Sequence, residues 1–270
     1  MKPPRAALDA LIEGRNADPF ALLGPHEGPG GTFLRALVPG AEAVTAFDLS
    51  GTALGDLKSV DTRGLFEGAV DGPAQPVKYR ARGHGAEWWI TDPYSFGPVL
   101  GPLDDFLMGE GNHFRLYDKM GAHLIEHQGV AGVHFAVWAP NAERVAVVGD
   151  FNDWNPGRHV MRRRLDVGVW EIFIPDIGEG RAYKFAITGP HGAEQPMKAD
   201  PFAFAAELRP KTASVTTAPP QHVWKDAPTA SIGRRSTRAV CRSASTRSMP
   251  DRGTATRMAG ISAGMRWPTG

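Results

Sequence analysis

A polar loop with a single tryptophan is the part of the chain whose residue types most directly suggest chemistry. The loop, Gly149-Asp150-Phe151-Asn152-Asp153-Trp154-Asn155, follows a strongly apolar run. Sugar rings present flat C–H faces that pack against aromatic planes, and their hydroxyl groups need amide, carboxylate or ammonium partners. Trp154 beside Asn152 and Asn155, with Lys184 on a nearby predicted strand, offers that combination. These four residues are candidates for a sugar-binding site.

A purely structural interpretation of the same loop stays open. Asn and Asp are common turn formers, so in this interpretation Asn152, Asp153 and Asn155 only shape the turn. Trp154 then covers the edge of a β-sandwich and meets no ligand. Residue types alone favour this structural interpretation.

Short strands separated by turn residues must position this loop. Before residue 100 the predicted strands are 32–38, 43–47, 64–70, 77–80 and 87–90. After it they are 133–138, 144–148, 169–174 and 182–187. A short amphipathic helix is predicted over 6–14. Because no other helix of useful length interrupts the strands, we expect an all-β protein of antiparallel sandwiches and not a parallel α/β sheet.

The two groups of strands share repeated residues. Val38-Pro39-Gly40-Ala41-Glu42-Ala43-Val44 is echoed by Ala139-Pro140-Asn141-Ala142-Glu143-Arg144-Val145, which lies 101 positions later. Asp92-Pro93-Tyr94 is echoed 108 positions later by Asp200-Pro201-Phe202. A repeat of this length indicates a duplicated domain, so we expect two tandem immunoglobulin-like β-sandwiches.

Domain limits follow from composition. The stretch 97–111 is rich in Gly, Pro and Asp, as is typical of a boundary between domains. We therefore predict a first module over 1–107, a second over 108–223 and a tail over 224–270.

In the first module, Trp88 and Trp89 are neighbours on a strand and must face opposite sides, so one should be core and the other surface or interface.

Charge sets the tail apart from the rest of the chain. The 270 residues carry 30 Lys+Arg and 29 Asp+Glu. Residues 231–270 hold eight arginines, no lysine and one aspartate, which is a net charge of +7, and the first 230 residues carry −6. The tail is also rich in Ser, Thr, Gly and Ala. It has too little apolar surface to offset the entropy of ordering, so we predict that it is disordered.

Several classes of protein are excluded by composition. The single cysteine, Cys241, excludes a scaffold stapled by disulfides. We expect a soluble cytoplasmic protein with no membrane partner, because neither a signal-like start nor a long apolar span occurs. His123 and His127 are four residues apart but lack the glutamate of a His-Glu-x-x-His site. We predict no metal site and no cofactor.

The loop 149–155, together with Gly168–Pro175 and Tyr183-Lys184-Phe185, resembles the glycogen-binding type of carbohydrate-binding module. That module precedes the catalytic domain of branching, debranching and related α-amylase-type enzymes. Asp18–His26 and Leu116–His123 are similar to bacterial 1,4-α-glucan (glycogen) branching enzymes that carry an extra amino-terminal β-sandwich. The tandem arrangement is what distinguishes branching from debranching enzymes. The resemblance implies a place in glycogen biosynthesis.

The likeness covers about Asp18 to Val223 and carries over to individual residues. It marks Trp154 as the aromatic sugar platform and Lys184 as a polar partner. Glucan-binding relatives often have a second tryptophan in the loop that corresponds to 189–194, which here contains no aromatic residue. We therefore expect α-glucan (glycogen) as a weakly bound partner.

The resemblance also implies an activity for which this chain lacks the residues. A branching enzyme cleaves an α-1,4 bond and transfers the released chain to a 6-hydroxyl with retention, which needs two carboxyl groups about 5–5.5 Å apart. In this family they stand on a (β/α)₈ barrel, which needs at least about 200 residues. Only 46 residues follow Trp224, and their carboxylates are Asp226 and Asp251. We predict no catalytic residues and a truncated enzyme that is inactive alone.

A shift of reading frame accounts for the unusual tail. Permitted codons for 243–254 can be chosen so that another frame reads Gly-Ile-Tyr-Glu-Val-His-Ala-Gly-Ser-Trp-His. The family continues after its second module with a strand close to Ile-Tyr-Glu-Val-His-x-Gly-Ser-Trp. The hypothesis is that a frameshift near 227–231 replaced the barrel by out-of-frame translation.

Two other classes of function stay as alternatives. One is a free-standing glucan-binding or scaffolding protein that recruits partners to glycogen. The other takes the arginine-rich tail as an arm for nucleic acid or an anionic surface. The tail arginines lack the aromatic interleaving of such arms, so we predict that nucleic acid is not a partner.

Overall fold

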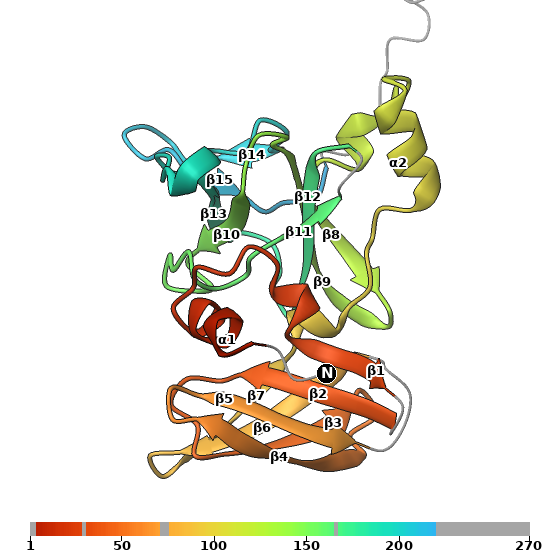
Figure 1. The fold of residues 1–270 in the computed structure, drawn as a ribbon. Coiled ribbons are helices and arrows are strands. Elements are labelled where there is room, and N and C mark those ends of the chain that lie inside the picture. The colour runs from red at the N-terminus through yellow and green to blue at the C-terminus, as the bar shows by residue number, and fades with distance from the viewer. Residues whose placement is uncertain (1–3, 29–30, 71–75, 165–166, 220–270) are drawn as a thin grey trace, which may run out of the picture. The chain divides into compact units, whose positions relative to one another are not determined.

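The computed structural model describes residues 4–28, 31–70, 76–164 and 167–219, and they form antiparallel β-sheets with two α-helices (Figure 1). Helix α1 (Arg5–Ile12) opens the chain, and α2 (Pro102–Gly109) lies between the two groups of strands. Single turns of 3₁₀-helix occur at Pro19–Ala21, Pro93–Ser95, Leu116–Asp118 and Pro190–Gly192. The predicted all-β class with tandem sandwiches and a short leading helix is confirmed. The predicted disordered tail lies outside the described residues.

The first module is built from a seven-stranded antiparallel sheet in the order β1-β2-β5-β4-β3-β6-β7. Its strands are β1 (Gly24–Gly28), β2 (Gly31–Leu37), β3 (Ala43–Asp48), β4 (Ala53–Asp61), β5 (Leu65–Val70), β6 (Val77–Gly83) and β7 (Ala86–Thr91). Strand β4 pairs with both β3 and β5, and its register with each neighbour shifts once. Such irregularities let a sheet bend around its own core. Alternate residues of β2, β3 and β6 fill that core, among them Leu34, Val44 and Tyr79.

The second module contains two four-stranded antiparallel sheets, in the orders β11-β12-β9-β8 and β10-β13-β15-β14. Its strands are β8 (Gly121–His127), β9 (Val130–Trp138), β10 (Arg144–Gly149), β11 (Arg162–Arg164), β12 (Val169–Pro175), β13 (Ala182–Thr188), β14 (Ala205–Ala206) and β15 (Ser214–Val215). Side chains of both sheets meet in one core, where Phe135 and Trp170 of one sheet join Tyr183 and Phe185 of the other.

Contacts between residues far apart in sequence tie the strands of the two modules into a single unit that spans residues 1–220. Leu49, in the turn after β3, packs against a buried cluster of Phe96, Val130 and Phe173. The hydroxyl of Thr91, at the end of β7, donates a hydrogen bond to the carboxylate of Asp176, which directly follows β12. The end of β7 therefore lies beside the loop that follows β12.

Strands in which apolar and polar residues alternate only weakly were not predicted from the sequence. Strand β1 contains Gly, Pro and His, and most of β4 is solvent-exposed. Neither strand needs an apolar face, because each packs few residues into the core. The segment 97–111, which we interpreted as an irregular boundary, contains α2. Pro102 occupies its first turn, and the carboxylate of Asp104 accepts a 3.0 Å hydrogen bond from the backbone N–H of Gly101.

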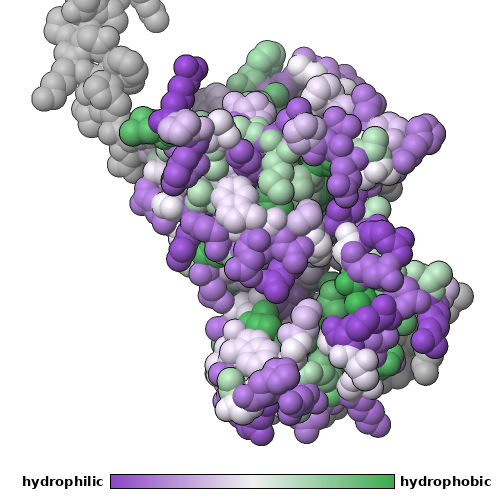
Figure 2. Space-filling view, turned by 90° about the vertical axis from the view of Figure 1, so that its left-hand side faces the viewer, coloured by the Kyte–Doolittle hydropathy of each residue, from purple (hydrophilic) through white to green (hydrophobic). Residues whose placement is uncertain are grey.

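The surface carries no broad apolar face in the view that Figure 2 presents. Hydrophobic side chains form only small areas there, scattered among hydrophilic ones. In the part of the chain that the structure describes, no helix is both long enough and apolar enough to cross a membrane.

Candidate functional site

The loop after β10 is a tight turn stabilised by its own polar groups. The backbone carbonyl of Gly149 accepts hydrogen bonds from the N–H groups of Asn152 (3.2 Å) and Trp154 (3.0 Å). The N–H of Gly149 donates to the side-chain oxygen of Asn152 at 2.9 Å. These bonds turn the chain back immediately after the strand, so that Trp154 is only partly buried.

The backbone of this turn requires unusual conformations. Asp153 and Trp154 both have positive φ, at 58° and 55°. A side chain larger than hydrogen cannot stand at position 149, because a Cβ atom there would lie 2.4 Å from the carbonyl oxygen of Ala182 and 2.6 Å from the ring of Phe151. Non-glycine residues at positive φ are uncommon and concentrate at functional sites, where surrounding structure holds them in place.

Asn152 holds the turn together from inside. Its side chain is 1% exposed. The amide nitrogen donates to the carbonyl of Val147 and to Nδ1 of His159, each at 2.9 Å. Burial, and then the charge of Arg158, lower the pKa of His159 to about 4, so its neutral ring offers Nδ1 as an acceptor. Both ends of the Asn152 amide are thus used within the protein, and this side chain positions the loop without facing solvent.

Asn155 and Lys184 are the polar candidates with a route to solvent. Asn155 is exposed, and its side-chain oxygen accepts a 2.8 Å hydrogen bond from the N–H of Gly157. Lys184 stands on β13 directly opposite Val148 of β10, one residue before the turn begins. Its ammonium group donates to the hydroxyl of Thr212 at 2.6 Å. The strand pairing therefore brings Trp154 and Lys184 to the same end of the β10/β13 pair.

The loop 189–194, which could form a second wall of the sugar site, has a different role. Residues 189–194 contain the 3₁₀ turn Pro190–Gly192, and the carboxylate of Glu143 accepts the backbone N–H groups of His191 (2.9 Å) and Gly192 (3.2 Å). The loop contains no tryptophan, tyrosine or phenylalanine. The arrangement offers one aromatic face with a lysine and an amide nearby. In the part of the chain that the structure describes, no group of three or more His, Cys, Asp or Glu side chains could hold a metal ion.

The adjacent tryptophans of β7 point to opposite sides, as predicted. Trp88 packs against the core of the first module, whereas Trp89 is 54% exposed. The alternation of a β-strand explains the division, since Trp88 and Ile90 share the core face.

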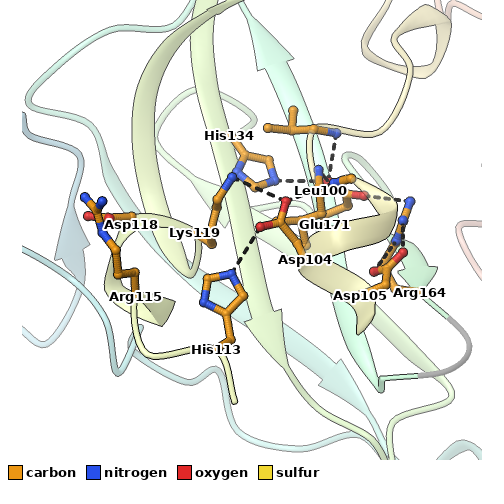
Figure 3. Close-up of polar contacts among 12 residues, drawn as sticks. Leu100, Asp104, Asp105, His113, Arg115, Asp118, Lys119, His134, Arg164 and Glu171 are labelled. Atoms are coloured by element: carbon orange, nitrogen blue, oxygen red, sulfur yellow. Dashed lines mark hydrogen bonds and ion pairs between the residues drawn. The ribbon is translucent and has the colours of Figure 1, made fainter. Parts of the chain in front are cut away.

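A buried group of charged side chains connects the segment before α2 to the second module (Figure 3). Glu171, on β12, is 2% exposed. Its Oε2 atom accepts hydrogen bonds from the backbone N–H groups of Val99 and Leu100, each at 3.0 Å, and lies 3.1 Å from Nε2 of His134. Arg164 approaches the other oxygen at 3.4 Å. One carboxylate thus anchors the connecting chain to the sheet.

The same group extends along α2. Arg164 forms an ion pair with Asp105 of the helix, and Asp104 contacts His113 (3.1 Å) and Lys119 (3.3 Å). Burial opposes ionisation of Glu171, but the hydrogen bond of His134, the N–H of Leu100 and the charge of Arg164 outweigh it and lower its pKa. The buried carboxylate therefore stays ionised and paired.

Sequence reasoning did not identify Glu171 as an anchor, although a signal was present. Strand β12 is buried along its whole length, and Glu171 is its only charged residue. A lone acid inside a continuous apolar strand is almost never left without a partner. Its partners were not predictable, because Val99 and His134 are 72 and 37 positions away.

Comparison with known proteins agrees with this arrangement of modules. Residues 4–94 match the family described as the amino-terminal domain of the alpha-1,4-glucan branching enzyme GlgB. Residues 119–203 match carbohydrate-binding module 48, the isoamylase amino-terminal domain. A 1,4-alpha-glucan branching enzyme GlgB from Novosphingobium aromaticivorans is 66% identical over 227 residues, which are 84% of this chain and 32% of that protein. The chain belongs to the 1,4-α-glucan branching enzyme family, through its amino-terminal region.

Other branching enzymes are similar over the same extent. The one from Mesorhizobium japonicum is 58% identical over 83% of this chain and 30% of its own length. The chain thus spans about a third of the length of the curated branching enzymes that it matches. Among solved structures, ligand-free PulA from Klebsiella pneumoniae has a TM-score of 0.33 and 21% identity, covering 68% of this chain and 20% of that one.

Proposed function

We propose that the second module of this branching-enzyme chain binds α-glucan at the turn after β10, with Trp154 as the platform for a sugar face. The observation that carries the proposal is the turn itself. A buried amide, Asn152, and a glycine that tolerates no side chain hold Trp154 at positive φ and partly exposed in a polar loop. Held in this way, the indole loses little entropy when a ligand packs on it.

Polar contacts complete the proposed site. Lys184 and Asn155 supply an ammonium group and an amide for the sugar hydroxyls. In this proposal Asn152 acts through the shape of the loop and does not touch sugar, because its amide is already paired inside the protein. With a single aromatic face and no opposite wall at 189–194, the site should bind weakly and favour a polymer that offers many contacts.

The role of the whole protein is proposed from its relatives. A branching enzyme of glycogen biosynthesis transfers an α-1,4-glucan segment to a 6-hydroxyl, and the modules described here would bring glucan to such an enzyme in the cytoplasm. We retain modules over 1–107 and 108–223 as the working domain limits. The 270 residues include no candidate pair of catalytic carboxylates, so we expect no branching by this chain alone.

Affinity electrophoresis tests the glucan site. The 270-residue chain should be retarded in gels that contain glycogen or amylopectin, and Trp154→Ala should weaken that retardation. Trp138→Ala is a matched control, since Trp138 is 64% exposed at the end of β9 and belongs to no candidate site. Equal mobility of the wild type with and without polysaccharide contradicts the proposal.

Iodine staining of amylose tests the activity. The purified chain should leave the absorbance of the amylose–iodine complex unchanged, because no residues for the transfer are present. A blue-to-red shift of the complex, which reports new branches, contradicts that expectation.

A further inference from the structure

The exposed tryptophan of the first module stands in a polar setting of its own. Trp89 lies on β7, the last strand of the seven-stranded sheet, directly opposite Arg80 of β6. The next pair in register on the same face is Thr91 with Lys78. Residues directly opposite each other in an antiparallel pair share one face, so these four side chains lie together on the outer face, away from the core.

A hollow of about 310 Å³ opens beside this tryptophan. Its wall is formed by the turn after β3, the outer face of β6 and β7, and the loop after β12, with the side chains of Asp48, Ser50, Lys78, Trp89, Thr91 and Asp176. The volume lies at the lower end of the range for small-molecule sites, about 300–1,000 Å³. Unlike the turn at Trp154, the hollow receives residues from both modules.

The indole of Trp89 is held in place from behind. Its ring lies 5.0 Å from the ring of Phe47, tilted by 60°. The guanidinium of Arg80 lies 5.0 Å from the Phe47 ring and 6.0 Å from the Trp89 ring. Phe47 is itself buried, so the three side chains form a packed stack of which Trp89 is the exposed member. A platform fixed in this way needs little further ordering when it binds.

The polar groups of the hollow are only partly used. Among the described residues, the ammonium group of Lys78 has no hydrogen-bond or ion-pair partner. Asp48 is oriented by the hydroxyl of Ser50 and the N–H of Thr52, each at 2.7 Å. One cationic donor and two carboxylate acceptors thus line the hollow beside the exposed indole.

These groups define the chemistry of a ligand. One cation, Lys78, stands beside two carboxylates, Asp48 and Asp176, so the hollow has no excess of positive charge that would attract an anion. A neutral ring with many hydroxyl groups can satisfy both donors and acceptors while one of its faces packs on the indole. We propose that the hollow beside Trp89 is a second carbohydrate site of this chain, which takes a few units of an α-glucan. The choice of α-glucan among carbohydrates rests on the proposed function.

Two sites on one chain should act together on a polymer. Each is weak alone, but a glycogen particle can engage both at once, and the second contact then forms at a high effective concentration. The wild-type chain, which has both sites, should therefore be retained on amylopectin more strongly than the summed retention of two variants that each keep one site.

Affinity gels with the 270-residue chain test the second site. Trp89→Ala should weaken binding to amylopectin by roughly fivefold or more, as expected for loss of a central aromatic contact. Each single variant should keep some binding through the other site. The double variant, Trp89→Ala with Trp154→Ala, should not bind. Trp138→Ala is the control for an exposed tryptophan outside both sites. Lys78→Ala, which leaves the aromatic stack in place, should also weaken binding.

An independent measurement covers the case in which Trp89→Ala perturbs the fold. Indole N–H signals of the wild-type chain are recorded by NMR during titration with maltoheptaose, and the Trp89 signal is assigned from Trp89→Phe. Movement of the Trp89 signal supports the site. The proposal is overturned if Trp89→Ala binds amylopectin as the wild type does, or if the Trp154 signal moves and that of Trp89 does not. If the wild type does not bind at all, the proposals for both sites are wrong. If only Trp154→Ala loses binding, the proposal for the Trp89 site alone is wrong.

Discussion

The hydroxyl of Tyr79 donates a 2.9 Å hydrogen bond to the buried carboxylate of Asp92, and the second module repeats the contact between Tyr183 and Asp200. In each module the other carboxylate oxygen accepts a backbone N–H two residues further on. The repeated Asp-Pro-aromatic motif therefore marks the same structural corner in both modules. Each corner ties the end of a module to its core.

Replacing Asp92 should change how stability depends on pH. Burial raises its pKa to about 6 from the ordinary 3.8, because the charged form is desolvated. The folded protein thus holds a proton that the unfolded chain has released. The contribution of Asp92 to the free energy of unfolding is fully present below about pH 4 and is lost as the pH rises through 6. The total change is up to about 3 kcal/mol.

Urea unfolding between pH 4 and pH 7 measures this effect. Asp92→Asn should flatten the pH dependence over that window, since the amide neither titrates nor becomes charged. Asp153→Asn, at an exposed position, should leave the slope of the wild type unchanged. A slope that is the same in Asp92→Asn and the wild type would refute the assignment.

Loss of the Glu171 carboxylate should strongly destabilise the fold. Glu171→Ala leaves the buried N–H groups of Val99 and Leu100 without their acceptor and removes the ion pair with Arg164, at a cost of about 3–5 kcal/mol. Chemical denaturation measures the loss, and Glu171→Gln, which keeps one oxygen acceptor, should lose less. The pH dependence has the opposite sign to that of Asp92. Because its pKa is lowered, the contribution of Glu171 is present above about pH 4.5 and disappears on acidification.

A methyl group at position 149 should disturb the turn that carries Trp154. Gly149→Ala forces a contact with the carbonyl oxygen of Ala182, at a cost of roughly 1–3 kcal/mol. Thermal unfolding should show the lower stability, and the emission of Trp154 should shift as its surroundings change. Gly178→Ala is the matched control, because no atom lies within 4 Å of a Cβ placed there. Equal melting temperatures for the two variants would contradict the close approach.

The gene should carry the rest of a branching enzyme in another reading frame. Similarity to the Novosphingobium aromaticivorans enzyme spans 227 of the 270 residues, and the arginine-rich segment 231–270 lies beyond the two matched families. We propose that translation leaves the family's frame near 227–231. Sequencing of the genomic DNA through this region, and translation of all three frames, checks the proposal. Absence of barrel-coding sequence downstream in every frame overturns it.

Local pattern was enough to predict the strands with clear apolar alternation and to reveal the duplication. Alternation of apolar and polar residues follows directly from the two-residue period of a strand, so runs such as 144–148 and 182–187 were identifiable without a partner. The repeat at Asp92 and Asp200 was visible as letters alone. The same alternation required Trp88 and Trp89 to face opposite sides.

Tertiary structure decided which polar side chains face solvent and which hold the fold. Asn152 and Asn155 are equivalent as turn formers, yet Asn152 is buried because Val147 and His159 close around its amide, and Asn155 is exposed. Burial depends on what packs from elsewhere in the chain, and alternation within one strand carries no information about those partners. For the same reason the hollow at Trp89 became visible only when Asp176 was placed beside β7, 87 positions from the tryptophan.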